Sequence, residues 1–283
     1  MGPLTPRAIS RLLARALAED AASHDATSRA VIPAALRIRA CIVSRAPGVL
    51  AGVKAAALAF TTLDRSLRCR LHRRSGASVA PGTTILTIEG RARSIFAAER
   101  TALNLLGHLS GIATLTAAFA RRARGTRARI FDTRKTLPGL RALEKDAVRA
   151  GGGQSHRGDL SEAILIKTNH LKALGGRRAI QQAVSRAKRA RPRKFVEIEV
   201  TNLSELKQAL AARPDGILLD NWRLPAIRKA VALRKGRRPL LEVSGGVTLA
   251  TVRAIARAGV ERISIGRLTH SAPSLDVSLK VMR

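Results

Sequence analysis

Cationic side chains gather in one segment of the sequence, residues 131–170, on both sides of a run of three glycines. Those at turn-like positions after short apolar runs are Arg134, Lys135, His156, Arg157 and Lys167. Arginine offers a planar fork that suits a carboxylate, and lysine offers a compact charge that suits a phosphate. Glycine lets the backbone approach a ligand closely. The segment therefore predicts a binding site for an anionic small molecule.

Each of these features also has a purely structural interpretation. The Arg-Lys pair could form a surface ion pair with Asp132, the ammonium of Lys167 could lie on a solvated rim, and the glycines could form only a flexible loop. A metal site at His156 is disfavoured, because His170 is the one candidate ligand nearby and no cysteine or paired histidine supports it.

Two carboxylates, Glu199 and Asp220, stand at the ends of successive apolar segments. This arrangement would hold ribose hydroxyls or a hydrated Mg²⁺ beside phosphates. Glu197 precedes Glu199 in the same segment, and we expect one of the two to point into the site and the other away. We assign Glu199 to the site because it is nearer the end of the segment. An alternative for Asp220 and Asn221 is the N-cap of the next helix.

Glycine turns follow two further apolar segments. Ser244, Gly245 and Gly246 come after LLEV, and Gly266 comes after RISI. Backbone N–H groups at a glycine turn that leads into a helix form a ready phosphate cradle, so we expect these turns to bind phosphate together. Arg267, which follows Gly266, adds a further possible anion contact.

The elements that position these residues are short and apolar. The strands we predict cover residues 128–132, 162–167, 195–200, 216–220, 240–245 and 262–266. Continuous apolar runs separated by helical stretches are typical of parallel strands buried on both faces. No GxGxxG opens the first unit, which favours a barrel over an open doubly wound sheet. In a barrel the site lies at the carboxyl ends of the strands, where the polar residues stand.

The first part of the chain has a different pattern. Helical spacing predicts an amphipathic helix over residues 7–19, and period-2 alternation predicts strands within 35–44, 66–73 and 83–90. A helical pattern extends from about residue 95 to 123. We expect Gly107 and the Ser110-Gly111 pair to break it into two helices.

The chain is strongly basic, with 52 Lys and Arg against 19 Asp and Glu and a net charge of +33. Much of the excess lies in clusters at residues 121–129, 186–194 and 228–238, next to predicted helices. We expect a solvated outer face that adheres to nucleic acid non-specifically at low salt. A dedicated nucleic-acid-binding protein is the alternative from a different class, disfavoured by an aromatic content of 2%.

Two cysteines, Cys41 and Cys69, cannot form a disulfide framework, which favours a reducing compartment. The sequence contains no run of 18 apolar residues, and its first twenty residues lack the apolar core of a signal peptide. We therefore expect a cytoplasmic protein without a membrane segment.

Several motifs occur together in one order between residues 80 and 275. They are ERTALNLLGHLSGIAT, DTRKTLPGLRALEKDAV, GGGQSHR, LIKTNH, VEIEV, LLDN, SGG and ISIGRLTHS. In this combination the chain resembles the quinolinate phosphoribosyltransferase family, also called carboxylating nicotinate-nucleotide pyrophosphorylases. The resemblance implies an α/β fold with an N-terminal α/β sandwich domain, residues 1–112 completed by 270–283, and an incomplete, open α/β barrel, residues 113–269.

The resemblance also implies an activity. Enzymes of the family join quinolinate to phosphoribosyl pyrophosphate with Mg²⁺ and lose CO₂, which gives nicotinate mononucleotide, pyrophosphate and CO₂ in NAD synthesis. They form homodimers, and a hexamer is an open alternative. A paralogous pyrophosphorylase-like protein of molybdenum transport shares DTRKT and the HR loop, and it is disfavoured here by LIKTNH, SGG and LTHS.

Carried over motif by motif, the resemblance gives each site residue a role. Arg100 would reach the substrate of the neighbouring subunit. Both carboxylates of quinolinate would be held by Arg134, His156, Arg157 and Lys167. The ribose and pyrophosphate would be held by Thr133, Lys135, Glu199 and Asp220, with Lys135, Glu199 and Asp220 as catalytic residues and the two acids on the metal, directly or through water. A phosphate would be held by Ser244, Gly245, Gly246, Gly266, Arg267 and Leu268.

Overall fold

The chain divides into two compact units, which the computed structural model describes over residues 6–282. The barrel unit comprises Ala118–Lys135 and Gly153–Arg267. The sandwich unit comprises Gly2–Ala117, Thr136–Gly152 and Leu268–Arg283. Each unit is described separately below.

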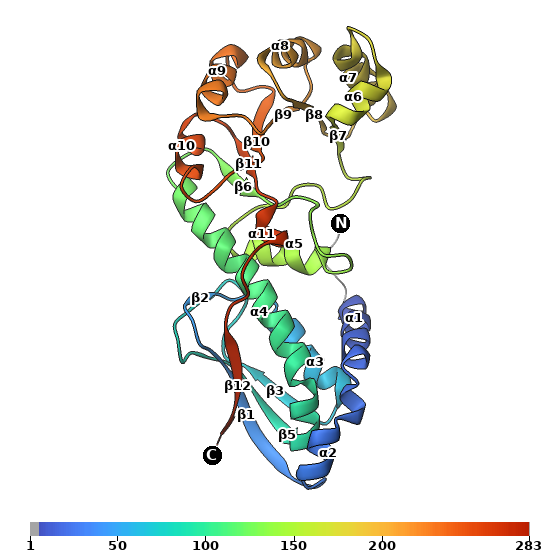
Figure 1. Cartoon of the computed structure of the whole chain (residues 1–283), viewed down its shortest axis with the longest axis vertical. Helices are drawn as coiled ribbons and strands as arrows, with labels where there is room; N and C mark the ends of the chain where they lie inside the picture. Colours follow the sequence, from blue (N-terminus) through green and yellow to red (C-terminus); the bar gives the residue numbers. More distant parts are fainter. Residues whose placement is uncertain (1–5, 283) are drawn as a thin grey trace. The chain divides into compact units, whose positions relative to one another are not determined.

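A six-stranded parallel sheet forms the centre of the barrel unit, and all six predicted strands are present (Figure 1). Its strands are β6 (Arg129–Phe131), β7 (Ile164–Ile166), β8 (Val196–Val200), β9 (Gly216–Asp220), β10 (Leu240–Ser244) and β11 (Arg262–Ser264). They lie in the order β6-β11-β10-β9-β8-β7. Because β6 and β7 are the two edges of this order, the barrel is open, as expected.

Helices follow the strands of the barrel unit. They are α6 (Thr168–Leu174), α7 (Ala179–Ala190), α8 (Leu203–Ala212), α9 (Leu224–Arg234) and α10 (Val252–Arg257). Helix α8 illustrates why they form where they do. The Asn202 side chain accepts a hydrogen bond from the Glu205 N–H (2.9 Å), which caps the helix, and Leu206 and Ala209 bury its apolar face.

An antiparallel sheet in the order β12-β1-β5-β3 forms the sandwich unit. Its strands are β1 (Arg37–Ser44), β3 (Arg68–Leu71), β5 (Thr84–Arg91) and β12 (Val277–Met282), and a short pair is added by β2 (Gly48–Val49) and β4 (Ser78–Val79). Its helices are α1 (Pro6–Glu19), the 3₁₀ turn η1 (Ala22–His24), α2 (Ala26–Val31), α3 (Val53–Leu63), α4 (Ala92–Ala123) as far as Ala117, α5 (Arg141–Ala150) and most of α11 (Arg267–His270). Ile42, Phe60, Ile88 and Leu106 lie in its core, with no exposed surface.

Helix α4 is continuous, so the predicted break near Gly107 and Gly111 is wrong. Both glycines lie where another segment of the chain packs directly on the helix. A Cβ at Gly111 would come within 2.1 Å of the Pro273 carbonyl oxygen, and a Cβ at Gly107 within 3.0 Å of the Leu275 oxygen. The glycines therefore permit close backbone contact and do not end the helix.

Helix α4 is also long and apolar enough, by length and composition alone, to cross a membrane. Of its most apolar window, 61% is buried inside the protein. Ile95, Ala102 and Leu106 of this helix belong to the core of the sandwich unit. Packing inside the protein therefore accounts for its apolar character.

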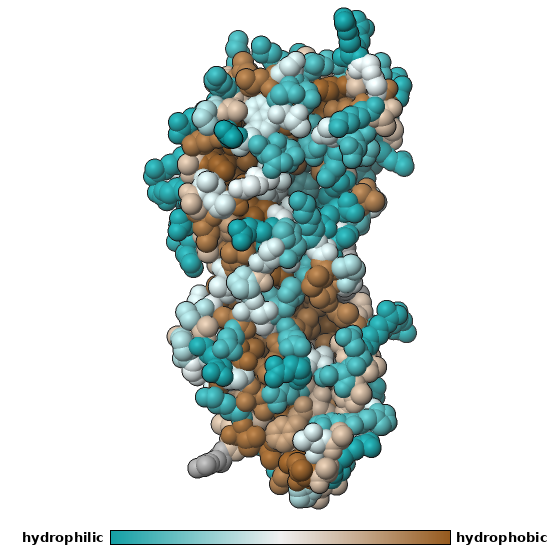
Figure 2. Space-filling model, in the orientation of Figure 1, coloured by the Kyte–Doolittle hydropathy of each residue, from teal (hydrophilic) through white to brown (hydrophobic). Residues whose placement is uncertain are grey.

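The three basic clusters lie mostly at the surface, and Figure 2 shows hydrophilic side chains projecting over the barrel helices. Arg234 is an exception, because it is buried and its guanidinium lies 2.6 Å from the Glu261 carboxylate. Cys41 and Cys69 are both free thiols, and burial raises the pKa of Cys69 to about 11.

Candidate active site

A cavity of about 290 Å³ lies at the carboxyl ends of the barrel strands. Most of the predicted site residues line it: Thr133, Arg134, Lys135, His156, Arg157, Lys167, Glu199, Asp220 and Ser244. Leu165, Leu218, Glu242 and Ser264 complete the lining. The structure thus brings cations from the loops after β6 and the end of β7 together with acids from β8 and β9.

Asp132, at the end of β6, has no exposed surface. Its Oδ1 accepts a hydrogen bond from the His156 backbone N–H (2.8 Å). This contact attaches the His156–Arg157 turn to the end of β6. Beside it, the Lys135 N–H donates to the Thr133 hydroxyl (3.0 Å), which shapes the turn that carries Arg134.

The His156–Arg157 turn is held at several further points. His156 Nε2 lies 3.1 Å from Glu197 Oε2 and 3.4 Å from Glu242 Oε1. The Arg157 guanidinium donates to the Ala163 carbonyl (3.3 Å), and burial together with the charge of Arg134 lowers the pKa of Arg157. Two guanidinium groups that repel each other in a partly buried cavity create a demand for a bound anion.

The first glycine of the triple-glycine run has a packing role. A Cβ at Gly151 would come within 2.3 Å of the Ala113 carbonyl oxygen on α4. Gly152 has a positive φ of 85°, which glycine adopts without strain. The run therefore serves at least the contact between α5 and α4.

Lys167 follows β7 directly, and its exposed side chain lines the cavity. Its backbone N–H donates to His170 Nδ1 (2.9 Å), so the His170 ring caps the start of α6.

The two acids lie at neighbouring strand ends. Glu199 Oε1 accepts hydrogen bonds from the Thr168 hydroxyl (2.7 Å) and backbone N–H (3.3 Å). Burial and the charge of Glu199 raise the pKa of Asp220, against the opposing effects of the Asn221 side chain and two lysines. A pair of carboxylates that disfavour each other's charge is a suitable donor set for a hard divalent cation.

The expectation that Glu197 and Glu199 point to opposite faces of β8 is wrong. Residues two apart on a strand share a face. Glu199 lines the cavity, while Glu197 lies deeper on the same face, 1% exposed, and reaches His156. Ile198 between them points away from this face and has no exposed surface.

The two glycine turns follow paired strands, since Ser244 of β10 is in register with Ser264 of β11. Gly245 and Gly246 have positive φ values of 85° and 62°, and a Cβ at Gly245 would come within 2.1 Å of the Asn221 side-chain oxygen. Helix α10 begins only at Val252, so the first turn does not lead directly into a helix as predicted. Gly266 and Arg267 follow β11 outside the cavity lining, and Leu268 is fully buried.

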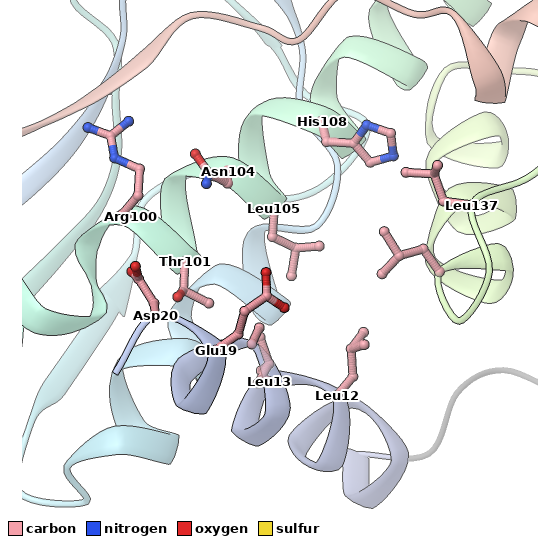
Figure 3. Close-up of a pocket in the computed structure, with 12 residues that line it drawn as sticks. Leu12, Leu13, Glu19, Asp20, Arg100, Thr101, Asn104, Leu105, His108 and Leu137 are labelled. Atoms are coloured by element: carbon pink, nitrogen blue, oxygen red, sulfur yellow. The ribbon is translucent and has the colours of Figure 1, made fainter. Parts of the chain in front are cut away.

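Arg100 is absent from this cavity and lies on α4 in the sandwich unit. It lines a separate pocket of about 360 Å³ between α1, α4 and the turn at Leu137 and Leu140 (Figure 3). Figure 3 shows Glu19 and Asp20 at the end of α1 near Arg100 and Thr101.

Glu242 and Ser264 are the polar cavity residues that sequence reasoning missed; Leu165 and Leu218 are the apolar ones. A signal existed, because Glu242 stands two residues before Ser244 on β10, and period-2 spacing places both on one face. Ser264, the last residue of β11, likewise stands two residues before Gly266.

Almost the whole chain matches one family of known proteins. Residues 25–110 match the family described as quinolinate phosphoribosyl transferase, N-terminal domain, and residues 112–280 match its C-terminal domain. A carboxylating nicotinate-nucleotide pyrophosphorylase of Mycobacterium leprae is 43% identical over 270 residues, 94% of each chain. A decarboxylating quinolinate phosphoribosyltransferase of Nicotiana glauca is 38% identical over 94% of this chain and 80% of the plant protein.

A solved structure of similar shape is the nicotinate-nucleotide pyrophosphorylase of Francisella tularensis. It superposes with a TM-score of 0.91 at 37% identity and covers 99% of this chain and 98% of its own. Both family domains, relatives above 30% identity over most of their length and the arrangement of the cavity agree. The chain belongs to the quinolinate phosphoribosyl transferase family.

Proposed function

We propose that this chain transfers the phosphoribosyl group of phosphoribosyl pyrophosphate to quinolinate and removes one carboxylate as CO₂, giving nicotinate mononucleotide and pyrophosphate for NAD synthesis. One observation carries the proposal. A single cavity is lined by the cations Arg134, Arg157 and Lys167 together with the acids Glu199 and Asp220. Such a cavity suits a dianionic acceptor together with a phosphorylated sugar that is bound through a cation.

The cations of the cavity would bind quinolinate. Arg134 and Arg157 are suited to fork-like pairing with its carboxylates, and Lys167 and His156, which line the same cavity, add charge. Because quinolinate nitrogen is a weak nucleophile, these groups act mainly by holding it in line with the ribose carbon.

The acids and the turn after β6 would bind the phosphoribosyl donor. Lys135 and Thr133 line the same cavity as Glu199 and Asp220, and Ser244 is the cavity residue of the first glycine turn. We extend the phosphate contact to Gly245, Gly246 and the segment 266–268. Glu199 and Asp220 would hold Mg²⁺, which supplies charge neutralisation of the pyrophosphate.

The reaction then needs no covalent enzyme intermediate. The pyridine nitrogen forms a bond to the ribose carbon as the bond to pyrophosphate breaks, and nearby carboxylates favour the positive charge that develops on the sugar. Loss of CO₂ leaves an electron pair on the ring carbon next to the positive nitrogen, and a proton takes its place. The cations of the cavity stabilise the negative charge on the leaving pyrophosphate in the first step and on the ring carbon in the second.

Arg100 has no place in the cavity of the barrel unit, and we propose that it completes the site of a second subunit. It is exposed on α4, free to extend to a partner. A homodimer, a cytoplasmic location without a membrane segment and only non-specific contact with nucleic acid belong to the same proposal.

A direct assay tests the function. Purified protein is incubated with Mg²⁺, phosphoribosyl pyrophosphate and quinolinate labelled in its 2-carboxylate, and labelled CO₂ and nicotinate mononucleotide are measured. Equal amounts of both products are expected, and omission of Mg²⁺ should abolish them. Absence of product with quinolinate and with nicotinate would refute the enzyme activity, and would leave the molybdenum-transport paralogue as the alternative.

A further inference from the structure

Two glutamates beneath the cavity have no role in the proposed binding scheme. Glu197 on β8 and Glu242 on β10 are 1% and 0% exposed. Both carboxylates approach one atom, His156 Nε2, at 3.1 Å and 3.4 Å. Burial of two ionised carboxylates is costly unless a cation compensates for it.

The oxygens of these glutamates leave much of their hydrogen-bonding capacity unused. Glu197 Oε1 and both oxygens of Glu242 are buried without a hydrogen-bond partner. Gly216 on the strand between them makes room for the group, since a Cβ there would come within 3.0 Å of Glu197 Oε1. The carboxylates are therefore held by charge more than by hydrogen bonds.

Arg262 supplies one compensating charge. Its guanidinium lies 3.9 Å from Glu242 Oε2 and packs over the rings of Phe131 and Phe195, 5.1 Å and 4.7 Å from their centres. Burial and the charge of Glu242 raise the pKa of Glu197, and His156 and Arg262 oppose that rise. When both carboxylates are ionised, they and the guanidinium leave one negative charge, which a protonated His156 neutralises. The four side chains then form a neutral buried group.

We propose that Glu197 and Glu242 are positioning residues that hold the His156 ring, and with it the His156–Arg157 turn, as a fixed cation facing quinolinate. This inference rests on the proposed function, in which His156 and Arg157 bind quinolinate. Asp132 fixes the backbone of the same turn from β6, so the turn is held by acids on three strands.

The charge state of His156 agrees with this arrangement. Burial opposes its charge, but the hydrogen bond to Glu197 and the charges of Glu197 and Glu242 prevail and raise the pKa of His156 to about 9. The Arg157 N–H, 2.8 Å from Nδ1, favours the neutral ring. The two carboxylates oppose this effect, and a pKa of about 9 favours a cationic ring at neutral pH. Asp132, Arg134, Arg157 and Arg262 are the other charged groups around it.

The test compares Glu197→Gln, Glu242→Gln and His156→Asn with the matched control Glu205→Gln on α8, outside the cavity. NMR of the imidazole carbons, with the His156 signal assigned by its loss in His156→Asn, gives the pKa of that ring. We expect each of these two glutamine variants to lower this pKa by about one to two pH units, and to raise KM for quinolinate about two- to tenfold at pH 8 while KM for phosphoribosyl pyrophosphate stays unchanged.

The alkaline limb of kcat/KM for quinolinate should also move to lower pH in these variants. The pKa of His156 in the folded protein lies above the ordinary value of about 6.5. The His156 ring is therefore fully charged below about pH 6.5 and loses its charge as the pH rises through about 9. Removing a carboxylate lowers the pH at which the His156 ring loses its charge. Glu205→Gln should match the wild type in all of these measurements.

Several outcomes would overturn the inference. One is an ordinary pKa near 6.5 for His156 in the wild type, which needs no variant to fold. Others are glutamine variants with an unchanged His156 signal, equal losses for both substrates, or a stoichiometric metal ion bound at His156 that a chelator removes. Absence of wild-type turnover refutes the proposed function and leaves the NMR result intact. If His156→Asn impairs the use of quinolinate but Glu197→Gln and Glu242→Gln do not, this inference is refuted and the proposed function stands.

Discussion

The cations of the cavity differ in how firmly the fold holds them. Arg134 and Arg157 are partly buried, whereas Lys167 is exposed at the start of α6 and its side chain can be shortened without opening a void. When a buried cation is removed, a loss of activity can come from weaker binding or from a less stable fold. Removal of the exposed Lys167 side chain affects binding alone. Lys167 is therefore the residue at which the quinolinate contact can be measured most cleanly.

We expect Lys167→Ala to lower kcat/KM for quinolinate about 10- to 100-fold, since loss of one charge-assisted contact costs about 1.5–3 kcal/mol. The thermal midpoint should remain that of the wild type. Lys172→Ala, which removes an exposed lysine from the same helix, is the control. Equal kinetics for the two variants would remove Lys167 from the site.

Among individual residues, the sequence predicted the site residues at the ends of strands better than the site residues inside strands. Arg134, Lys167 and Asp220 follow apolar runs, and the carboxyl ends of parallel strands meet at one edge whatever the exact register. Glu242 stands inside an apolar run, where a charge looks like an exception. The positions of His156, whose N–H donates to Asp132, and of Arg262 give that charge its partners.

Two glycines of α4 show why helix ends cannot be predicted from local helix propensity alone. Gly107 and Gly111 disfavour a helix when read alone. In the sandwich unit they allow the 273–275 segment to lie against α4, a contact between residues far apart in the sequence. Tertiary packing of this kind cannot be seen in a local pattern, whereas the six barrel strands, each apolar and continuous, could be predicted directly.

Gly111→Ala tests this explanation. In an open helix the change gains about 1 kcal/mol, but here the new methyl would meet the Pro273 carbonyl, and we expect a net loss of about 2 kcal/mol or more. Gly107→Ala, with a 3.0 Å contact, should lose less. Chemical denaturation measures both. A Gly111→Ala protein as stable as the wild type would show that the glycine serves another purpose.

For the whole molecule, the location of Arg100 makes a prediction about assembly. If it completes the site of a partner subunit, Arg100→Ala and Lys135→Ala proteins are each nearly inactive, but a mixture recovers activity. Half of the dimers in an equal, fully exchanged mixture are mixed, and each has one intact site of two, so about one quarter of wild-type activity is expected.

The mixture is assayed after partial denaturation and refolding, which allows subunits to exchange. Mixing Arg100→Ala with wild type that was treated in the same way controls for losses during refolding. Activity in the variant mixture no higher than the mean of the two variants would contradict a shared site.

Net charge and composition predicted less about the whole molecule than the motifs did. The charge of +33 fits a nucleic-acid partner as well as a solvated enzyme surface. The exposed positions of the clusters on the outer helices agree with a solvated surface, and family membership identifies the enzyme. Composition reports the total charge but not which face carries it, and only the fold separates the basic surface from the basic cavity.

The pairing of β1 with β12 has a consequence for the order of synthesis. Residues 277–282 follow the whole barrel unit in the sequence, yet they supply the fourth strand of a sheet whose other strands are complete by residue 91. On the ribosome, one edge of β1 stays open to other chains until the barrel has been translated. Arg37 and Arg39 on that strand place charge there, and such charge discourages a second nascent chain from pairing with it in the meantime.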